Sequence, residues 1–149
     1  MNANRSLAEM EAVSLGKLAW VVPLSTAVAV IANVIFYYII TRWFHVGLRF
    51  PSDTPDHTLS ATMAVGDVVL FSVIFALGAG VVFAIVAQSA RRPVRTYLMI
   101  ATAVLLVSFL LPLRIPSPPV AMIDKLSLVV MHIIGAIAVV GVLVGLGRK

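Results

Sequence analysis

Four polar residues stand inside long apolar stretches of the sequence: Asn33, Asp67, Ser108 and His132. Amides, hydroxyls and imidazoles exchange hydrogen bonds, and imidazoles also carry protons in many proteins. Ionisable groups within membrane spans are costly and tend to face a bundle interior or a cavity. The four residues therefore form a candidate polar pocket for proton handling or ligand binding. The alternative is a structural role, in which a neutral His132 holds the helices in register through hydrogen bonds.

The segments that carry these residues are long enough to cross a membrane. Of 149 residues, 61% are hydrophobic and 11% are charged, which excludes an ordinary soluble domain. The apolar residues arrive in blocks of about 20, and each block covers the ~30 Å hydrocarbon layer at ~1.5 Å per residue. We therefore expect an all-α membrane protein, an up-down four-transmembrane-helix bundle. It comprises an N-terminal segment (1–17) and a transmembrane domain (18–149) with helices at about 18–43, 60–90, 94–114 and 120–147.

Depth arithmetic brings three of the polar residues to one level. With ~1.5 Å per residue, Asn33, Ser108 and His132 lie about 5 Å from the midplane, all in the same half of the membrane. Asp67 lies nearer the interface, about 10 Å or more from the midplane. Asn33 can both donate and accept hydrogen bonds. The sequence thus predicts a direct or water-bridged contact between His132 and Asn33, with Ser108 as the next candidate.

Two spans carry small residues at regular spacing, which lets neighbouring helices approach closely. The second span has Ser72, Ala76, Gly80 and Ala84 at every fourth position, and the fourth span has Gly141 and Gly145. At 100° per residue, the first row lies opposite Asp67 and the glycine pair lies opposite His132. Either stripe can pack the bundle or meet a second subunit, and we expect packing within the chain.

Basic residues are unequally divided between the two sides of the predicted bundle. Seven lie with the termini and the turn between the second and third spans, and four lie on the other side. The seven are Arg5, Lys17, Arg91, Arg92, Arg95, Arg148 and Lys149, and the four are Arg42, Arg49, Arg114 and Lys125. The positive-inside rule therefore predicts that both termini lie in the cytoplasm, with Trp20 and Tyr97 near the inner ends of their spans. We expect the protein to lie in the plasma membrane. We expect membrane lipids around the protein and no nucleic acid partner.

No residue pattern for catalysis, a cofactor or a metal stands out. A bis-histidine haem needs two ligands inside the bilayer, and only His132 lies within a span. The chain has no cysteine, which excludes disulfide and thiolate-metal chemistry. Asp53, Asp56 and His57 suit a divalent ion, but a solvated proline-rich loop is the favoured interpretation. We therefore expect a protein that is not an enzyme and that has no cofactor and no metal.

Three short segments also point to a family. Asn33, the stretch Ser108-Phe-Leu-Leu-Pro112 and the stretch Leu126-Ser-Leu-Val-Val-Met-His132 resemble a family of small four-span bacterial membrane proteins of unknown function, frequent in actinobacteria. The resemblance implies a four-helix integral membrane protein and no particular activity.

Two functions follow from the sequence. The first is a non-enzymatic accessory or structural subunit, which meets a second copy or another membrane protein through its small-residue faces. The alternative is a small oligomeric transporter or channel with a polar pocket around His132 and Asn33.

Overall fold

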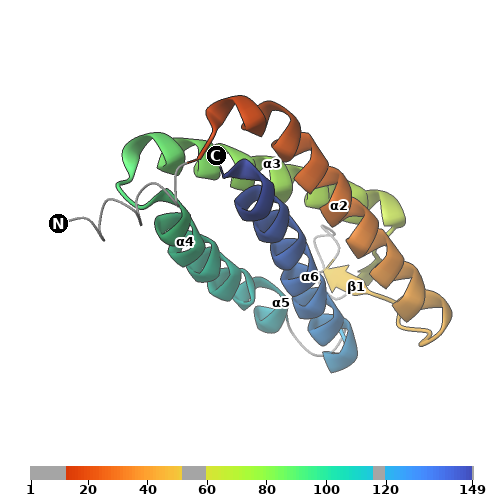
Figure 1. Ribbon diagram of the computed structural model, residues 1–149. Helices are drawn as coiled ribbons and strands as arrows, with labels where there is room; N and C mark the ends of the chain where they lie inside the picture. Colours follow the sequence, from red (N-terminus) through yellow and green to blue (C-terminus); the bar gives the residue numbers. More distant parts are fainter. Residues whose placement is uncertain (1–12, 52–59, 116–119, 149) are drawn as a thin grey trace.

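The computed structural model describes residues 13–51, 60–115 and 120–148. Within this part of the chain, four helical spans are long and apolar enough to cross a membrane. They are α2 (Leu15–Arg42), α3 (Val65–Ser89), α4 (Pro93–Ser108) continued by α5 (Leu110–Arg114), and α6 (Met122–Gly147). The chain runs up and down through these spans, so the predicted all-α four-helix membrane fold is confirmed (Figure 1).

The connection between α2 and α3 contains a short two-stranded ribbon that the sequence analysis did not anticipate. Strand β1 (Arg49–Pro51) pairs antiparallel with β2 (Ser60–Thr62), with Arg49 opposite Thr62. Because Ser60–Thr62 is extended, α3 begins at Val65 rather than near residue 60. The Asp67 carboxylate accepts a hydrogen bond of 2.8 Å from the backbone N–H of Ala64 and so caps the first turn of α3.

The third span is interrupted near its end. Pro93 lies in the first turn of α4, where a missing N–H costs nothing, but Pro112 lies in α5. Pro112 has no N–H to offer the carbonyl of Ser108, and its ring crowds that carbonyl. The helix accordingly breaks at Phe109, between α4 and α5.

The start of α2 and the end of α6 meet at one end of the bundle. The Ser14 N–H donates to the Gly147 carbonyl at 2.9 Å, and the Lys17 ammonium donates to the Arg148 carbonyl at 2.8 Å. A hydrophobic core lies beside them and includes Leu18, Val21, Phe83, Tyr97 and Leu143. A second core at the opposite end includes Ile40, Leu48, Val68, Leu128 and Met131.

The small-residue row of α3 faces α2. Ser72, Ala76 and Gly80 are buried, and Ala84 is half-buried. A Cβ atom at Gly80 would lie only 2.7 Å from Cγ1 of Val22, so these two helices approach closely because residue 80 lacks a side chain.

The glycine pair of α6 departs from our expectation of packing within the chain. Gly141 and Gly145 are exposed, and a Cβ atom at either would meet nothing within 4 Å. The reason lies in the phase of α6, whose buried residues Val139, Leu143 and Gly147 occupy another face.

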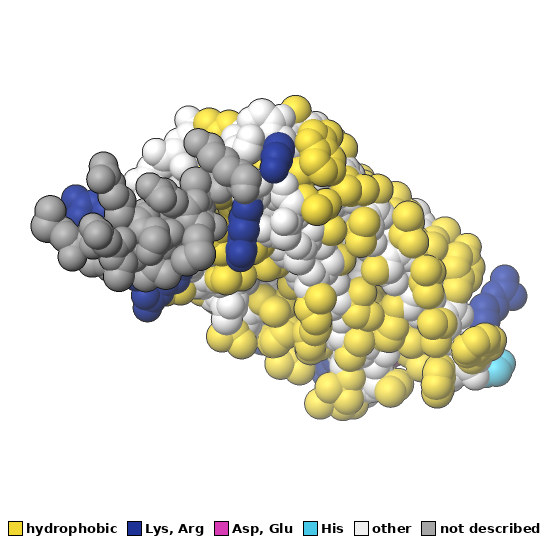
Figure 2. Space-filling view, in the orientation of Figure 1, with side chains coloured by type: hydrophobic (Ala, Val, Ile, Leu, Met, Phe, Trp, Pro, Cys, Tyr) yellow, Lys and Arg dark blue, Asp and Glu magenta, His cyan; other side chains and the backbone are white. Residues whose placement is uncertain are grey.

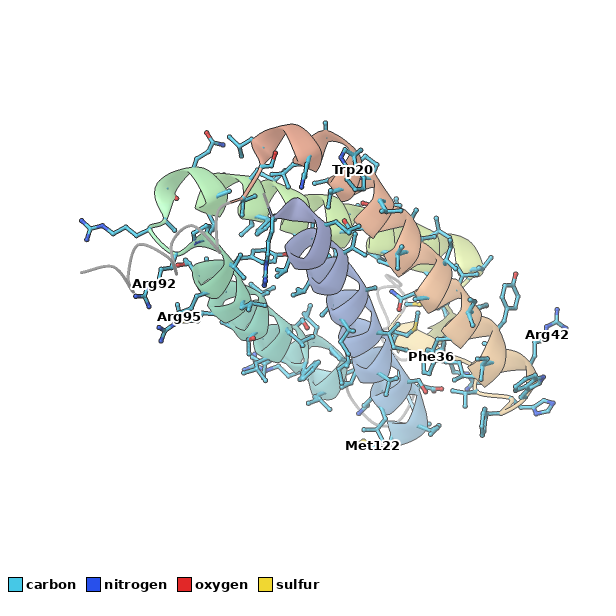
Figure 3. All side chains as sticks on the ribbon, in the orientation of Figure 1. Trp20, Phe36, Arg42, Arg92, Arg95 and Met122 are labelled. Atoms are coloured by element: carbon cyan, nitrogen blue, oxygen red, sulfur yellow. The ribbon has the colours of Figure 1, made fainter. Side chains whose placement is uncertain are left out.

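Charge and hydrophobicity divide the surface along the bundle axis. Figure 2 shows hydrophobic side chains over most of the visible face, with basic side chains mainly toward the ends. Arg92 and Arg95 lie at the end that holds the α3–α4 turn, and Arg42 lies at the opposite end (Figure 3). The exposed apolar middle is the surface expected of helices that face lipid.

Candidate functional site

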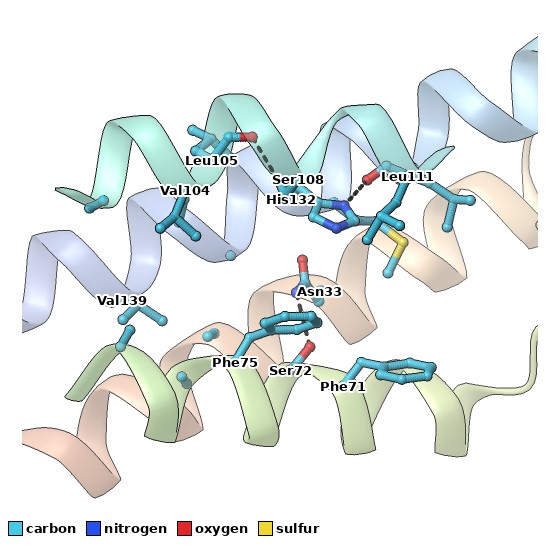
Figure 4. A pocket seen from close by; sticks show the side chains of 18 of the residues that line it. Asn33, Phe71, Ser72, Phe75, Val104, Leu105, Ser108, Leu111, His132 and Val139 are labelled. Carbon is cyan, nitrogen blue, oxygen red and sulfur yellow. Dashed lines mark hydrogen bonds between the residues drawn. The ribbon is translucent and has the colours of Figure 1, made fainter. Parts of the chain in front are cut away.

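A cavity of about 630 Å³ lies between α3, α4–α5 and α6, and α2 contributes Ala29 and Asn33 to it (Figure 4). This volume falls within the ~300–1,000 Å³ range of small-molecule pockets. Most of its lining is apolar, and no Asp, Glu, Lys or Arg side chain contributes to the wall. A ligand that fits here is therefore mainly apolar.

The cavity exists because the middle of the third span stands away from the other helices. The buried residues of α4 are Pro93, Val94 and Tyr97, all in its first turns, and none of the later α4 residues is buried. After the break at Phe109, the next buried residue of this span is Pro112 of α5. The third span thus contacts its neighbours closely at its two ends and stands away from them between.

One side of the cavity is open between α3 and α4–α5. Phe71 and Phe75 of α3 and Val104 and Leu111 of α4–α5 line the cavity and are also exposed on the outer surface. If the four spans cross a membrane, this opening faces the acyl chains. Molecules dissolved in the bilayer would reach the cavity sideways.

The end of the cavity nearest the α3–α4 turn is closed. Tyr97 lines it and is 1% exposed, and its ring centroid lies 4.6 Å from that of Phe83. Tyr97 lies near the start of α4, as its position beside the basic turn predicts, but its ring is buried in the bundle. The ring is buried because the close packing of α3 and α4 at this end draws it inward. The Tyr97 hydroxyl has no hydrogen-bond partner among the described residues.

Asn33 is held at the junction of three helices. Its Nδ2 donates to Ser72 Oγ of α3 at 3.0 Å, and a Cβ atom on Gly135 of α6 would lie 3.2 Å from that nitrogen. The side chain is 7% exposed. Its Oδ1 is buried and has no partner within the described part of the chain. A buried acceptor without a partner is uncommon and calls for an explanation.

His132 lines the same cavity from α6, but it does not hydrogen-bond directly to Asn33. The ring is half-buried, and Nδ1 lies 2.7 Å from the Leu128 carbonyl of its own helix. Because a carbonyl can only accept, Nδ1 carries the hydrogen, and in an uncharged ring Nε2 is then an acceptor. In Figure 4 the Asn33 oxygen points across the cavity toward this imidazole.

The other two predicted pocket residues differ in position. Ser108 lines the cavity, and its hydroxyl donates to the Leu105 carbonyl at 2.7 Å, so it does not serve His132. Asp67 is not among the lining residues, since its carboxylate caps the first turn of α3. The structure thus brings together three of the four predicted residues.

Two contributors to the site were not predicted from the sequence. Ser72 was assigned only to helix packing, yet it both packs on α2 and binds Asn33. The depth of Ser72 within its span is the feature of the sequence from which this second role could have been predicted. Tyr97 gave no such signal, since an aromatic residue near a basic turn is typical of the membrane interface.

The described residues contain no group of three or more His, Asp or Glu side chains placed to hold a metal ion. Asp53, Asp56 and His57 lie outside the described residues. The cavity therefore offers shape, apolar surface and a few hydrogen-bonding atoms.

The sequence matches one family over nearly its whole length. The matching model, described as "Family of unknown function (DUF6069)", covers residues 13–149. The chain belongs to the DUF6069 family. The match includes all four spans and every residue that lines the cavity. No curated protein and no solved structure matches the chain.

Proposed function

We propose that this DUF6069 protein is a non-enzymatic, accessory membrane protein that binds an apolar small molecule drawn from the bilayer. The observation that carries the proposal is the apolar cavity of about 630 Å³ with its sideways opening between α3 and α4–α5. Such a site accepts a ligand that never leaves the lipid phase, so no aqueous entrance is needed.

The alternative of a transporter or channel has weaker support. An ion path needs polar groups along its length, because a charge in an apolar passage is costly. This cavity is mainly apolar and ends at the contact between Tyr97 and Phe83. Both features favour binding over conduction.

Orientation in the membrane belongs to the same proposal. The start of α2 and the end of α6 are joined by the Ser14–Gly147 hydrogen bond, and Arg91, Arg92 and Arg95 lie in or beside the turn between α3 and α4. The positive-inside rule favours a cytoplasmic location for this end, and we propose that the protein lies in the plasma membrane. Reporters fused to each terminus are expected to be active only on the cytoplasmic side, and external activity at either end would reverse the orientation.

Native mass spectrometry of the protein released from nanodiscs tests the binding function. Ala101 lines the cavity, whereas Ala103 on the same helix is exposed and does not. We expect the wild type and Ala103→Phe to retain an apolar molecule and Ala101→Phe to lose most of it, because the new ring fills the cavity. The spectra also report the number of subunits.

Equal retention by the two phenylalanine variants, or no retained molecule in the wild type, would contradict the proposal. Circular dichroism provides the control for folding. Because Ala101→Phe adds a ring where space exists, we expect its helical content to match that of Ala103→Phe.

A further inference from the structure

The cavity contains a buried hydrogen-bond acceptor that nothing in the described chain satisfies. Asn33 is 7% exposed, its Nδ2 is bound to Ser72, and its Oδ1 has no partner among the described residues. The close approach of Gly135 holds the carboxamide in place. Leaving such an oxygen unpaired is costly, so a group that donates a hydrogen bond would be bound favourably there.

A second acceptor faces the first. The Leu128 carbonyl occupies Nδ1 of His132, which leaves Nε2 of an uncharged ring with a lone pair. The Asn33 oxygen points toward this ring across the cavity (Figure 4). Ser108 does not satisfy either atom, because its hydroxyl is bound to the Leu105 carbonyl. A ligand suited to this place therefore brings hydrogen-bond donors.

Charge narrows the class of ligand further. None of the lining residues is Asp, Glu, Lys or Arg, so no cationic side chain would neutralise a phosphate or carboxylate. Two facing acceptors would also repel an anion. Burial of an unpaired charge is far more costly than burial of a hydroxyl that finds an acceptor.

We propose that the cavity binds an uncharged lipid with a hydroxyl-bearing head group, of the monoacylglycerol type. One hydroxyl donates to Asn33 Oδ1 and another to His132 Nε2, and the acyl chain leaves through the opening beside Phe75 and Val104. This inference rests on the proposed function and specifies its ligand. It also accounts for the orphaned oxygen of Asn33.

Binding of three lipids with the same acyl chain tests the inference. The probes are 1-oleoylglycerol, methyl oleate and 1-oleoyl lysophosphatidic acid, each titrated into the full-length protein in nanodiscs and measured by native mass spectrometry. Methyl oleate has no hydroxyl donor, and lysophosphatidic acid adds a charge. We expect 1-oleoylglycerol to bind about tenfold more tightly than either, a difference of about 1.4 kcal/mol.

Two variants locate the preference in the cavity. His132→Phe keeps a ring but removes the Nε2 acceptor, so it should reduce the preference for 1-oleoylglycerol over methyl oleate severalfold. Ser127→Ala is the matched control, because Ser127 is on the same helix as His132, does not line the cavity, and donates its hydroxyl to the Ile123 carbonyl. We expect this variant to keep the wild-type preference.

The outcomes separate the two proposals. If methyl oleate binds wild-type protein as tightly as 1-oleoylglycerol does, and Ala101→Phe weakens both, the head-group inference fails and the binding function stands. Tightest binding of lysophosphatidic acid would also overturn the inference. If none of the three lipids binds the wild type, the proposed function fails as well. A poorly folded His132→Phe would leave the lipid series on the wild type as the deciding result.

Discussion

Helices α2 and α4, two of the neighbours of α3, pack against it in opposite ways. Toward α2, a row of small residues allows backbones to approach until Val22 reaches the surface of Gly80. Toward α4, close packing is confined to the end where Tyr97 meets Phe83, and a cavity follows. Helix α2 stabilises the bundle through close contact with α3. Helix α4 instead leaves a space beside α3, together with polar atoms that have no hydrogen-bond partner among the described residues. This contrast suggests that α2, α3 and α6 form the stable frame and that α4–α5 forms the wall of a binding site.

The largest expected effect comes from forcing α2 and α3 apart. Gly80→Leu places a side chain where even a Cβ atom would lie 2.7 Å from Val22, so we expect it to lower the free energy of unfolding by about 2–3 kcal/mol. Gly78→Leu is the control, because Gly78 is exposed and has no neighbour within 4 Å. Unfolding in sodium dodecyl sulfate, followed by circular dichroism, measures both. Similar losses in the two variants would mean that α2 and α3 are not in close contact.

Smaller effects on the free energy of unfolding are expected from removing two tyrosine hydroxyls. The two effects should have opposite signs, because one hydroxyl has a hydrogen-bond partner and the other has none among the described residues. The Tyr37 hydroxyl donates to the Met63 carbonyl at 3.1 Å, whereas the Tyr97 hydroxyl is buried without a described partner. In lipid-extracted protein, we expect Tyr37→Phe to lower the free energy of unfolding by about 1 kcal/mol and Tyr97→Phe to raise it by a similar amount. The same unfolding titration measures the pair. A loss in both variants would show that Tyr97 is satisfied in the empty protein.

The smallest effect is expected at the outward glycines of α6. Gly141→Leu and Gly145→Leu add side chains to open surface, so the free energy of unfolding should change by less than about 1 kcal/mol. The number of subunits, read by native mass spectrometry, should also stay the same. A change in subunit number would show that this face meets a second copy, as the sequence analysis considered.

The sequence predicted the fold because span length and hydropathy are properties of single segments. It also predicted that Asn33, Ser108 and His132 lie near one another, since depth follows from position within a span, and all three line the cavity. The residue at which α3 begins was harder to predict from the sequence, because Ser60–Thr62 becomes a strand only by pairing with Arg49–Pro51.

Rotation of the helices about their axes could not be predicted in the same way. Gly80 and Gly141 stand in similar small-residue patterns, yet one touches α2 and the other faces outward. Which face of a helix meets which neighbour depends on all four spans together. For the same reason Asn33 binds Ser72 rather than His132.

The distance between α3 and α4 at two levels tests the central claim most directly, because the cavity requires these helices to diverge. The chain has no cysteine, so nitroxide labels can be placed at introduced cysteines without further changes. Ile85 and Leu98 report on the turn end, and Ile74 and Val107 report on the far end, and all four are exposed. Pulsed electron spin resonance in nanodiscs should give a clearly longer separation for Ile74–Val107 than for Ile85–Leu98. Equal separations would mean that α4 runs parallel to α3, and the cavity and the function built on it would be contradicted.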